Sequence, residues 1–258
     1  MSGVLAAGLA LALFASPIAA RSGEPAPPPR PLACLARYYG VRPLEKDGAW
    51  YAVLPGGGRS LYDYGEERSF EERLRVPDLH DTFSVRYRRG PIHPVTDVDD
   101  DPGRIRHYPL FDAIYPEGGI VEVRLFGQSV EVHRKIAPAL ARVGKRLERA
   151  ARTNATLTAF FHPLGHGYAR RAISGTARAS AHDYGIAIDL NPRLTDYWRW
   201  GRRASDPVIW KNRVPQAIVD AFEAEGFIWG GRWYHFDTGH FEYRPELLDP
   251  ACYSDVAR

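Results

Sequence analysis

The segment SAHDYGIAID, residues 180–189 of the 258-residue chain, places a histidine and an aspartate on either side of a glycine. The apolar run from Ile186 to Leu190, which contains the aspartate, is typical of a short buried strand. Gly185 permits a close backbone approach or an unusual φ angle where the chain enters that strand. The segment therefore predicts a bend across which His182 and Asp189 converge.

A second segment, DTGHFE at residues 237–242, predicts part of a final hairpin that also holds Trp229 and Trp233 and turns at Gly230-Gly231. His240 on a strand next to Asp189 completes a set of two nitrogens and one oxygen. Three protein ligands leave a fourth position for water, which is the arrangement of a catalytic zinc site rather than a structural one.

Asp237 lies three residues before His240, and in a turn it stands beside a metal without ligating it. From there a carboxylate can take a proton from metal-bound water, which is the chemistry of amide hydrolysis. A ferrous oxygenase also uses two histidines and a carboxylate, but its first histidine and carboxylate are usually separated by one residue. The wider spacing of His182 and Asp189 counts against that alternative.

Mixed helix and strand signals without a βαβ repeat predict an α+β fold. Strands are expected at residues 50–54 and 60–64 around a Pro-Gly turn, at 120–126, at 156–161 and at 186–190. Helices are expected over 132–147, with Pro138 in the first turn, and over 215–225. Asp97, Asp99 and Asp101 imitate a calcium loop, but the glycine and glutamate it needs are missing, so an acidic turn is expected.

The composition is that of a globular protein, with 45% hydrophobic residues and 34 Lys and Arg against 31 Asp and Glu. The net charge of +3 is too small to argue for a nucleic-acid partner. Residues 1–20 resemble a secretory signal peptide, with an uncleaved anchor as the alternative, and 21–31 a Pro-rich linker. We therefore expect a secreted or periplasmic protein with no stable membrane insertion after cleavage. The sequence does not predict an oligomeric state.

The chain has two cysteines, Cys34 and Cys252, which lie near opposite ends of the exported part. An oxidising compartment allows them to form a disulfide, with two unpaired thiols as the alternative. We expect the bond, which would fasten the N-terminal segment to the C-terminal end.

The pattern Ser-x-His-x-x-Gly-x-Ala-x-Asp followed by Asp-x-x-His resembles the M15 zinc peptidases, which include D-alanyl-D-alanine carboxypeptidases and L-alanyl-D-glutamate endopeptidases. The stretches DPGRIR at 101–106, RAISGT at 171–176 and GFIWGGRW at 226–233 are similar to an exported branch, subfamily C of that family. The resemblance covers roughly residues 70–248. We expect a peptidase domain at 76–258, with its zinc in a cleft on a small antiparallel sheet flanked by helices. Residues 32–75 form an N-terminal extension with a hairpin.

This resemblance implies zinc ligands at His182, Asp189 and His240, a general base at Asp237, and peptidoglycan stem peptides as substrates. It also places at Arg171 the arginine that binds a substrate carboxylate or the developing oxyanion, although Arg170 is adjacent. A planar guanidinium suits that role, and a surface arginine is the alternative.

Four further features leave alternatives open. Ser180 either contacts substrate or caps a turn, and Glu242 either holds a ligand histidine by a hydrogen bond or is a solvated strand residue. His162 and His166 are not assigned to the metal. Core packing explains most of five clustered tryptophans, and one or two line the cleft; they are Trp198, Trp200, Trp210, Trp229 and Trp233.

The function predicted is an exported zinc peptidase that hydrolyses amide bonds in stem peptides, of either the carboxypeptidase or the endopeptidase type. The alternative is a wall-binding or signalling module that keeps the zinc fold without turnover. Asp237 favours the enzyme, because a binding module needs the three ligands but not the base.

Overall fold

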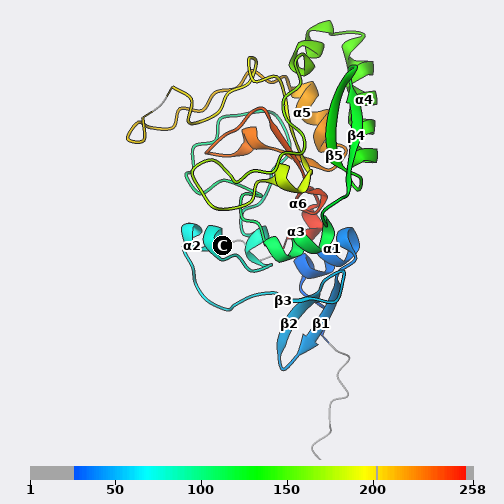
Figure 1. Ribbon diagram of the computed structural model, residues 1–258. Coiled ribbons are helices and arrows are strands. Elements are labelled where there is room, and N and C mark those ends of the chain that lie inside the picture. Colours follow the sequence, from blue (N-terminus) through cyan, green and yellow to red (C-terminus); the bar gives the residue numbers. More distant parts are fainter. Residues whose placement is uncertain (1–25, 202, 254–258) are drawn as a thin grey trace, which may run out of the picture.

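The computed structural model describes residues 26–201 and 203–253 (Figure 1). It has mixed α+β architecture with three small antiparallel sheets, whose strand orders are β1-β2-β3, β4-β5 and β6-β8-β7. The predicted fold class is confirmed. The predicted signal peptide at 1–20 and the first part of the predicted linker lie outside the described residues.

The N-terminal extension holds helix α1 (Arg30–Tyr39) and strands β1 (Arg42–Lys46), β2 (Ala49–Val53) and β3 (Arg59–Leu61). The hairpin expected on either side of the Pro-Gly turn is confirmed as β2 and β3, and β1 adds a third strand that was not predicted. The linker prediction was wrong at its end, because Arg30 and Pro31 already belong to α1. Proline is tolerated in the first helical turn, where its missing N–H has no acceptor.

Two short helices, α2 (Phe70–Arg75) and α3 (Tyr108–Ile114), flank an irregular segment. Ser69 and Glu72 close the start of α2 with a capping box, in which each side chain bonds the other residue's backbone N–H. The expected acidic turn is present, since Asp100 donates its backbone N–H to the Asp97 carbonyl at 3.1 Å.

Strands β4 (Ile120–Leu125) and β5 (Gln128–His133) form a hairpin that packs against helix α4 (Ala137–Ala151; Figure 1). Pro138 lies in the first turn of α4 as expected. The predicted helical start was wrong, because Val132 belongs to β5 and its side chain is buried there.

The strand predicted at 156–161 was also wrong. Residues Ala155–Phe161 form a 3-10 helix, and the Asn154 side chain accepts the N–H of Thr156 at its start. Leu157 and Phe160 are buried three residues apart, which is one turn of such a helix.

The third sheet joins β6 (Ala187–Asp189), β8 (His240–Tyr243) and β7 (Phe227–Trp229), with helix α5 (Gln216–Glu223) packed against β7. The ring of Phe222 on α5 stacks on that of Phe241 on β8, with centroids 4.0 Å apart. The predicted hairpin is confirmed for β7 and β8, but Trp233 lies in their connection and not in a strand. This small sheet rests on a fully buried aromatic core.

A disulfide joins Cys34 on α1 to Cys252 in the turn after helix α6 (Pro245–Leu248), with the two Cα atoms 5.4 Å apart. The predicted bond is confirmed. It fastens the N-terminal extension to the end of the described chain. Among residues 26–201 and 203–253, no helix combines the length and the apolar character that crossing a membrane requires.

Candidate active site

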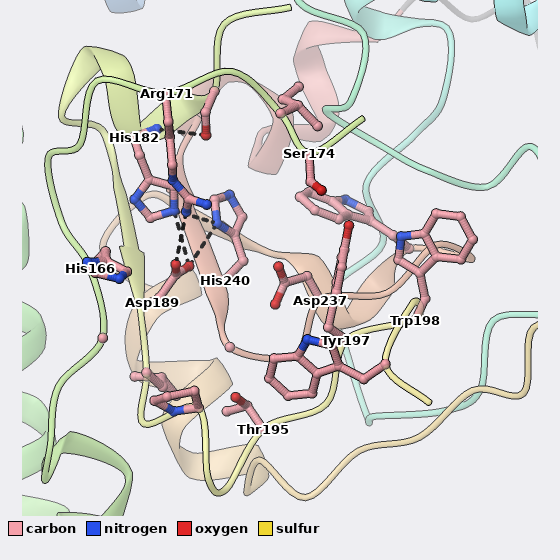
Figure 2. A pocket seen from close by; sticks show the side chains of 18 of the residues that line it. His166, Arg171, Ser174, His182, Asp189, Thr195, Tyr197, Trp198, Asp237 and His240 are labelled. Atoms are coloured by element: carbon pink, nitrogen blue, oxygen red, sulfur yellow. Dashed lines mark hydrogen bonds and ion pairs between the residues drawn. The ribbon is translucent and has the colours of Figure 1, made fainter. Parts of the chain in front are cut away.

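Three side chains meet at the edge of the third sheet. Asp189 on β6 and His240 on β8 are directly opposite partners, which brings the Asp189 Oδ1 and His240 Nδ1 atoms to 3.2 Å. His182 Nε2 lies 3.1 Å from the same Oδ1 atom and 3.2 Å from His240 Nδ1 (Figure 2). The structure thus brings together the three residues that the sequence predicted as ligands.

His182 reaches this position from a 3-10 turn, Ala181–Tyr184, which ends at Gly185. Gly185 has a φ of +65°, and a Cβ there would lie 2.7 Å from the backbone nitrogen of His133. The Gly185 carbonyl accepts a hydrogen bond from that nitrogen at 2.8 Å. Both expectations for this glycine, an unusual φ and a close approach, are confirmed, and the contact fixes the turn against β5.

The remaining hydrogen bonds of the two histidines determine which ring nitrogen of each carries the hydrogen and which keeps its lone pair. His182 Nδ1 lies 2.6 Å from the Gly167 carbonyl, an acceptor, so Nδ1 carries the hydrogen and Nε2 keeps its lone pair. His240 Nε2 faces Glu242 at 3.4 Å, which leaves the lone pair on Nδ1. Three lone-pair atoms therefore point at one another.

This donor set fits a zinc ion. Two imidazole nitrogens and a carboxylate oxygen are zinc ligands, and a tetrahedral ion with bonds near 2.0–2.1 Å needs ligand atoms about 3.3 Å apart. The separations of 3.1–3.2 Å are close to that value. Among the described residues the same three side chains form a group that could hold a metal ion.

The electrostatics of the group also favour a cation. Burial alone would raise the pKa of Asp189, but His182 and His240 hold it far below its usual range. Burial would lower the pKa of His240, but hydrogen bonds to Asp189 and Glu242 raise it to about 9. At neutral pH and without a metal, a second hydrogen therefore occupies Nδ1 of His240, and a cation bound there would displace that proton to use the lone pair.

A buried network of charged side chains stands behind His240. Glu242 is fully buried and accepts hydrogen bonds from Arg106, with its Nε at 3.1 Å, and from Arg244 Nη1 at 3.3 Å. Arg244 Nε also donates to Glu246 at 2.6 Å, and the hydroxyl of Tyr39 on α1 donates to the same carboxylate. Of the two alternatives for Glu242, the structure shows the hydrogen bond to a histidine and not the solvated strand residue. The network extends from the metal group to the N-terminal extension.

Asp237 is half-buried in the wall of a cavity of about 490 Å³ that the metal group also lines. Its backbone N–H donates to the Gly230 carbonyl at 3.0 Å, which fixes the turn before β8. Burial and the nearby Asp189 carboxylate raise the pKa of Asp237 to about 7. In Figure 2 its carboxylate points into the cavity beside the metal group without joining it.

Arg171 also lines the cavity, and its Nη2 lies 3.3 Å from the outer oxygen of Asp189. Its side chain is 46% exposed. Arg170 instead pairs with Glu117 and does not line this cavity. Of the two arginines only Arg171 lines the cavity, and its contact with substrate stays a prediction.

Ser180 does cap a turn, because its hydroxyl accepts the backbone N–H of His182 at 3.3 Å. It also lines the cavity, so contact with substrate stays a prediction. His166 lines the cavity and His162 does not, and neither belongs to the metal group.

Of the clustered tryptophans, Trp198, Trp200 and Trp233 line the cavity, which is more than the one or two expected. Trp229 is fully buried, in keeping with the core role expected for most of the group. The indole N–H of Trp210 donates to the Gly231 carbonyl at 3.0 Å.

One buried pair beside the cavity, Asp101 and His235, was not predicted from the sequence, and of the two only His235 lines the cavity. Asp101 is fully buried, accepts the His235 backbone N–H at 3.0 Å, and lies 2.6 Å from His235 Nδ1. Burial opposes ionisation of Asp101, but His235 and Arg104 lower its pKa. Describing Asp101 only as part of an acidic turn was therefore incomplete. The cation three residues later, Arg104, is the signal that could have indicated a buried carboxylate.

Residues 174–243 match the model of the M15 peptidase family described as D-alanyl-D-alanine carboxypeptidase. The matched segment holds His182, Asp189, Asp237 and His240, so the resemblance read from the sequence is confirmed over it. A domain of this family is a metallopeptidase domain, and the family is zinc-dependent. The prediction of an enzyme is confirmed on this ground. No solved structure matches the chain.

Proposed function

We propose that this protein is an exported zinc-dependent peptidase that hydrolyses amide bonds in peptidoglycan stem peptides, of the D-Ala-D-Ala carboxypeptidase or the L-Ala-D-Glu endopeptidase type. One observation carries the proposal. Three mutually facing lone-pair atoms, from His182, Asp189 and His240, line the same cavity as a carboxylate with a raised pKa.

The three ligands would hold the zinc from one side and leave the cavity side open for substrate and water. A zinc ion bound there would polarise the scissile carbonyl and lower the pKa of water. His182 and His240 are prepared for this role because Gly167 and Glu242 fix their tautomers.

Asp237 is the general base in this proposal. With its pKa near 7, the carboxylate takes a proton from the attacking water and passes it to the leaving amine. Its position beside the metal group, on a turn bonded to Gly230, keeps it within the cavity and out of the ligand set.

Arg171 binds the substrate carboxylate or the developing oxyanion. Its Nη2 contact to Asp189 is 3.3 Å long, and its exposed guanidinium borders the cavity. A planar guanidinium offers paired donors to either group, which a lysine ammonium does not. Ser180 is the further substrate-contacting residue of the proposal, in addition to capping the His182 turn.

Location outside the cytoplasm is supported by two features. Residues 1–20 have the composition of a signal peptide, and the cysteine pair is oxidised. The alternative that the sequence left open was a non-catalytic wall-binding or signalling module, because the same fold can hold zinc without turnover. Asp237 argues against it, since binding alone needs no carboxylate of raised pKa beside the ligands.

Mass spectrometry of synthetic stem pentapeptides after incubation with the zinc-loaded protein tests the proposal. We expect fragments shortened by hydrolysis of one defined amide bond. A chelator should abolish the products, and added zinc should restore them. Intact peptides after incubation with protein of verified zinc content would favour the binding module.

A further inference from the structure

Three aromatic side chains form one wall of the cavity: Tyr197, Trp198 and Trp200, which we call the aromatic shelf. The Tyr197 ring lies edge-on to both indoles, with centroids 6.2 Å from Trp198 and 6.1 Å from Trp200. Trp200 is 56% exposed, which is unusual for so large an apolar side chain. An exposed indole at the edge of a cavity indicates a binding surface rather than core packing.

The shelf is fixed to the segment that carries Asp237. Tyr197 pairs with Asp237 in an isolated antiparallel bridge, and the backbone N–H of Trp198 donates to the Phe236 carbonyl at 2.9 Å. The Trp198 ring also packs on His235, with centroids 4.6 Å apart. In Figure 2 Tyr197 and Trp198 lie on the same side of the cavity as Asp237, so a ligand that passes over Asp237 would continue onto the shelf.

Polar groups alternate with the aromatic faces. The Arg199 guanidinium lies over the Trp198 ring at 4.8 Å and donates to the Ser174 carbonyl at 3.1 Å. Ser174 is exposed and also lines the cavity. The guanidinium covers one face of Trp198, while Trp200 stays exposed. An exposed aromatic face with hydrogen-bonding groups beside it matches a pyranose ring, which has C–H faces and a rim of hydroxyl and amide groups. An aliphatic peptide side chain would use the faces and leave the polar rim unmatched.

We propose that the aromatic shelf binds the N-acetylated amino sugar to which the stem peptide is attached. This inference rests on the proposed function and adds a substrate class to it: the peptide that still carries its sugar. It also selects the bond. Because the shelf adjoins Asp237, a bound sugar brings the sugar end of the stem to the site, and of the two bonds in the proposed function L-Ala-D-Glu is the one at that end. The D-Ala-D-Ala bond lies three residues, or roughly 10 Å of extended chain, further along.

The first test measures binding without catalysis. Metal-free protein is titrated with the N-acetylglucosamine–N-acetylmuramic acid disaccharide, which carries no peptide, and followed by NMR. Trp200→Ala should weaken binding about 3- to 10-fold, the effect expected for loss of one aromatic contact. Ile209→Ala is the matched control, because Ile209 is 67% exposed further along the same connection and does not line the cavity. Undetectable binding to wild type, or equal binding to Trp200→Ala, would overturn the proposal.

The second test compares hydrolysis of one stem peptide with and without the disaccharide. The wild type should have a higher kcat/KM for the sugar-bearing substrate and cleave its L-Ala-D-Glu bond. In Trp200→Ala the ratio of the two kcat/KM values should fall by the same factor by which disaccharide binding weakens. An equal fall on both substrates, or cleavage only at D-Ala-D-Ala, would contradict the sugar assignment. If neither substrate is cleaved, the proposed function fails, and the disaccharide titration still decides whether the shelf binds sugar.

Discussion

Glu242 Oε2 lies 3.4 Å from Nε2 of His240, on the opposite side of the imidazole from the Nδ1 atom that faces Asp189. The buried carboxylate therefore decides which nitrogen of His240 carries the hydrogen. Arg106 and Arg244 in turn neutralise Glu242 and hold its pKa well below its usual range, although burial opposes this. The Nδ1 lone pair that the proposed zinc would use thus depends on residues outside the metal group.

Glu242→Gln should lower zinc affinity by about 10- to 100-fold, the usual effect of losing a hydrogen-bond partner behind a ligand histidine. A chromophoric chelator that competes for zinc gives the affinity, and circular dichroism checks the fold. Glu225→Gln is the control, because Glu225 pairs with Arg142 and Arg146 outside the site. Unchanged affinity in a folded Glu242→Gln protein would remove Glu242 from the metal site.

Asp237→Asn should keep its zinc and lose about 10²- to 10⁴-fold in kcat, because the amide cannot accept the proton. The base acts when ionised, so activity of the wild type should rise as the pH increases through the pKa of Asp237. Burial and Asp189 raise that pKa to about 7, and a dication beside Asp189 would lower it. Activity near the wild-type level in the zinc-loaded variant would exclude Asp237 as the base.

Arg171→Lys should lose nearly as much kcat/KM as Arg171→Ala, because an ammonium cannot form a planar paired contact with a carboxylate or an oxyanion. Arg170→Lys is the matched control, since Arg170 pairs with Glu117 outside the cavity. Steady-state kinetics on the stem peptide gives kcat/KM for the Arg171 variants and for the control. A fully active Arg171→Lys protein would reduce Arg171 to a surface charge.

Reduction of the Cys34–Cys252 bond should lower the melting temperature while zinc stays bound. The cysteines are 218 positions apart, and chain entropy for so long a loop gives up to about 5 kcal/mol of stabilisation. Calorimetry with and without reductant, together with a zinc assay, makes the comparison. Two free thiols per chain in the exported, denatured protein without reductant would show that the bond does not form.

The metal group could be predicted from the sequence because its signals are local. His182 and Asp189 share one segment, and Gly185 marks the bend between them. His240 lies in the predicted final hairpin, three residues after Asp237. Errors arose where an apolar run fits two structures. Val132 fits the helical spacing of α4 but belongs to β5, and the apolar residues at 156–161 predict a strand although they form a 3-10 helix, because an apolar run alone does not distinguish the two.

The supporting residues could not be predicted because long-range packing creates their contacts. Arg106 meets Glu242 from 136 positions away, and Tyr39 meets Glu246 from 207 positions away. No local pattern distinguishes such arginines and tyrosines from surface residues. Asp101 is the instructive case, since its acidic neighbours suggested a solvated turn while the fold buries it against His235.

The most direct test of the account is the position of the metal itself. Crystals of the zinc-loaded protein should be measured just above and just below the zinc absorption edge. We predict one strong anomalous peak per chain, at about 2.0–2.1 Å from His182 Nε2, Asp189 Oδ1 and His240 Nδ1. His182→Ala crystals should lack it. A peak held by other residues, such as His162 and His166, or no peak at this site would contradict the account.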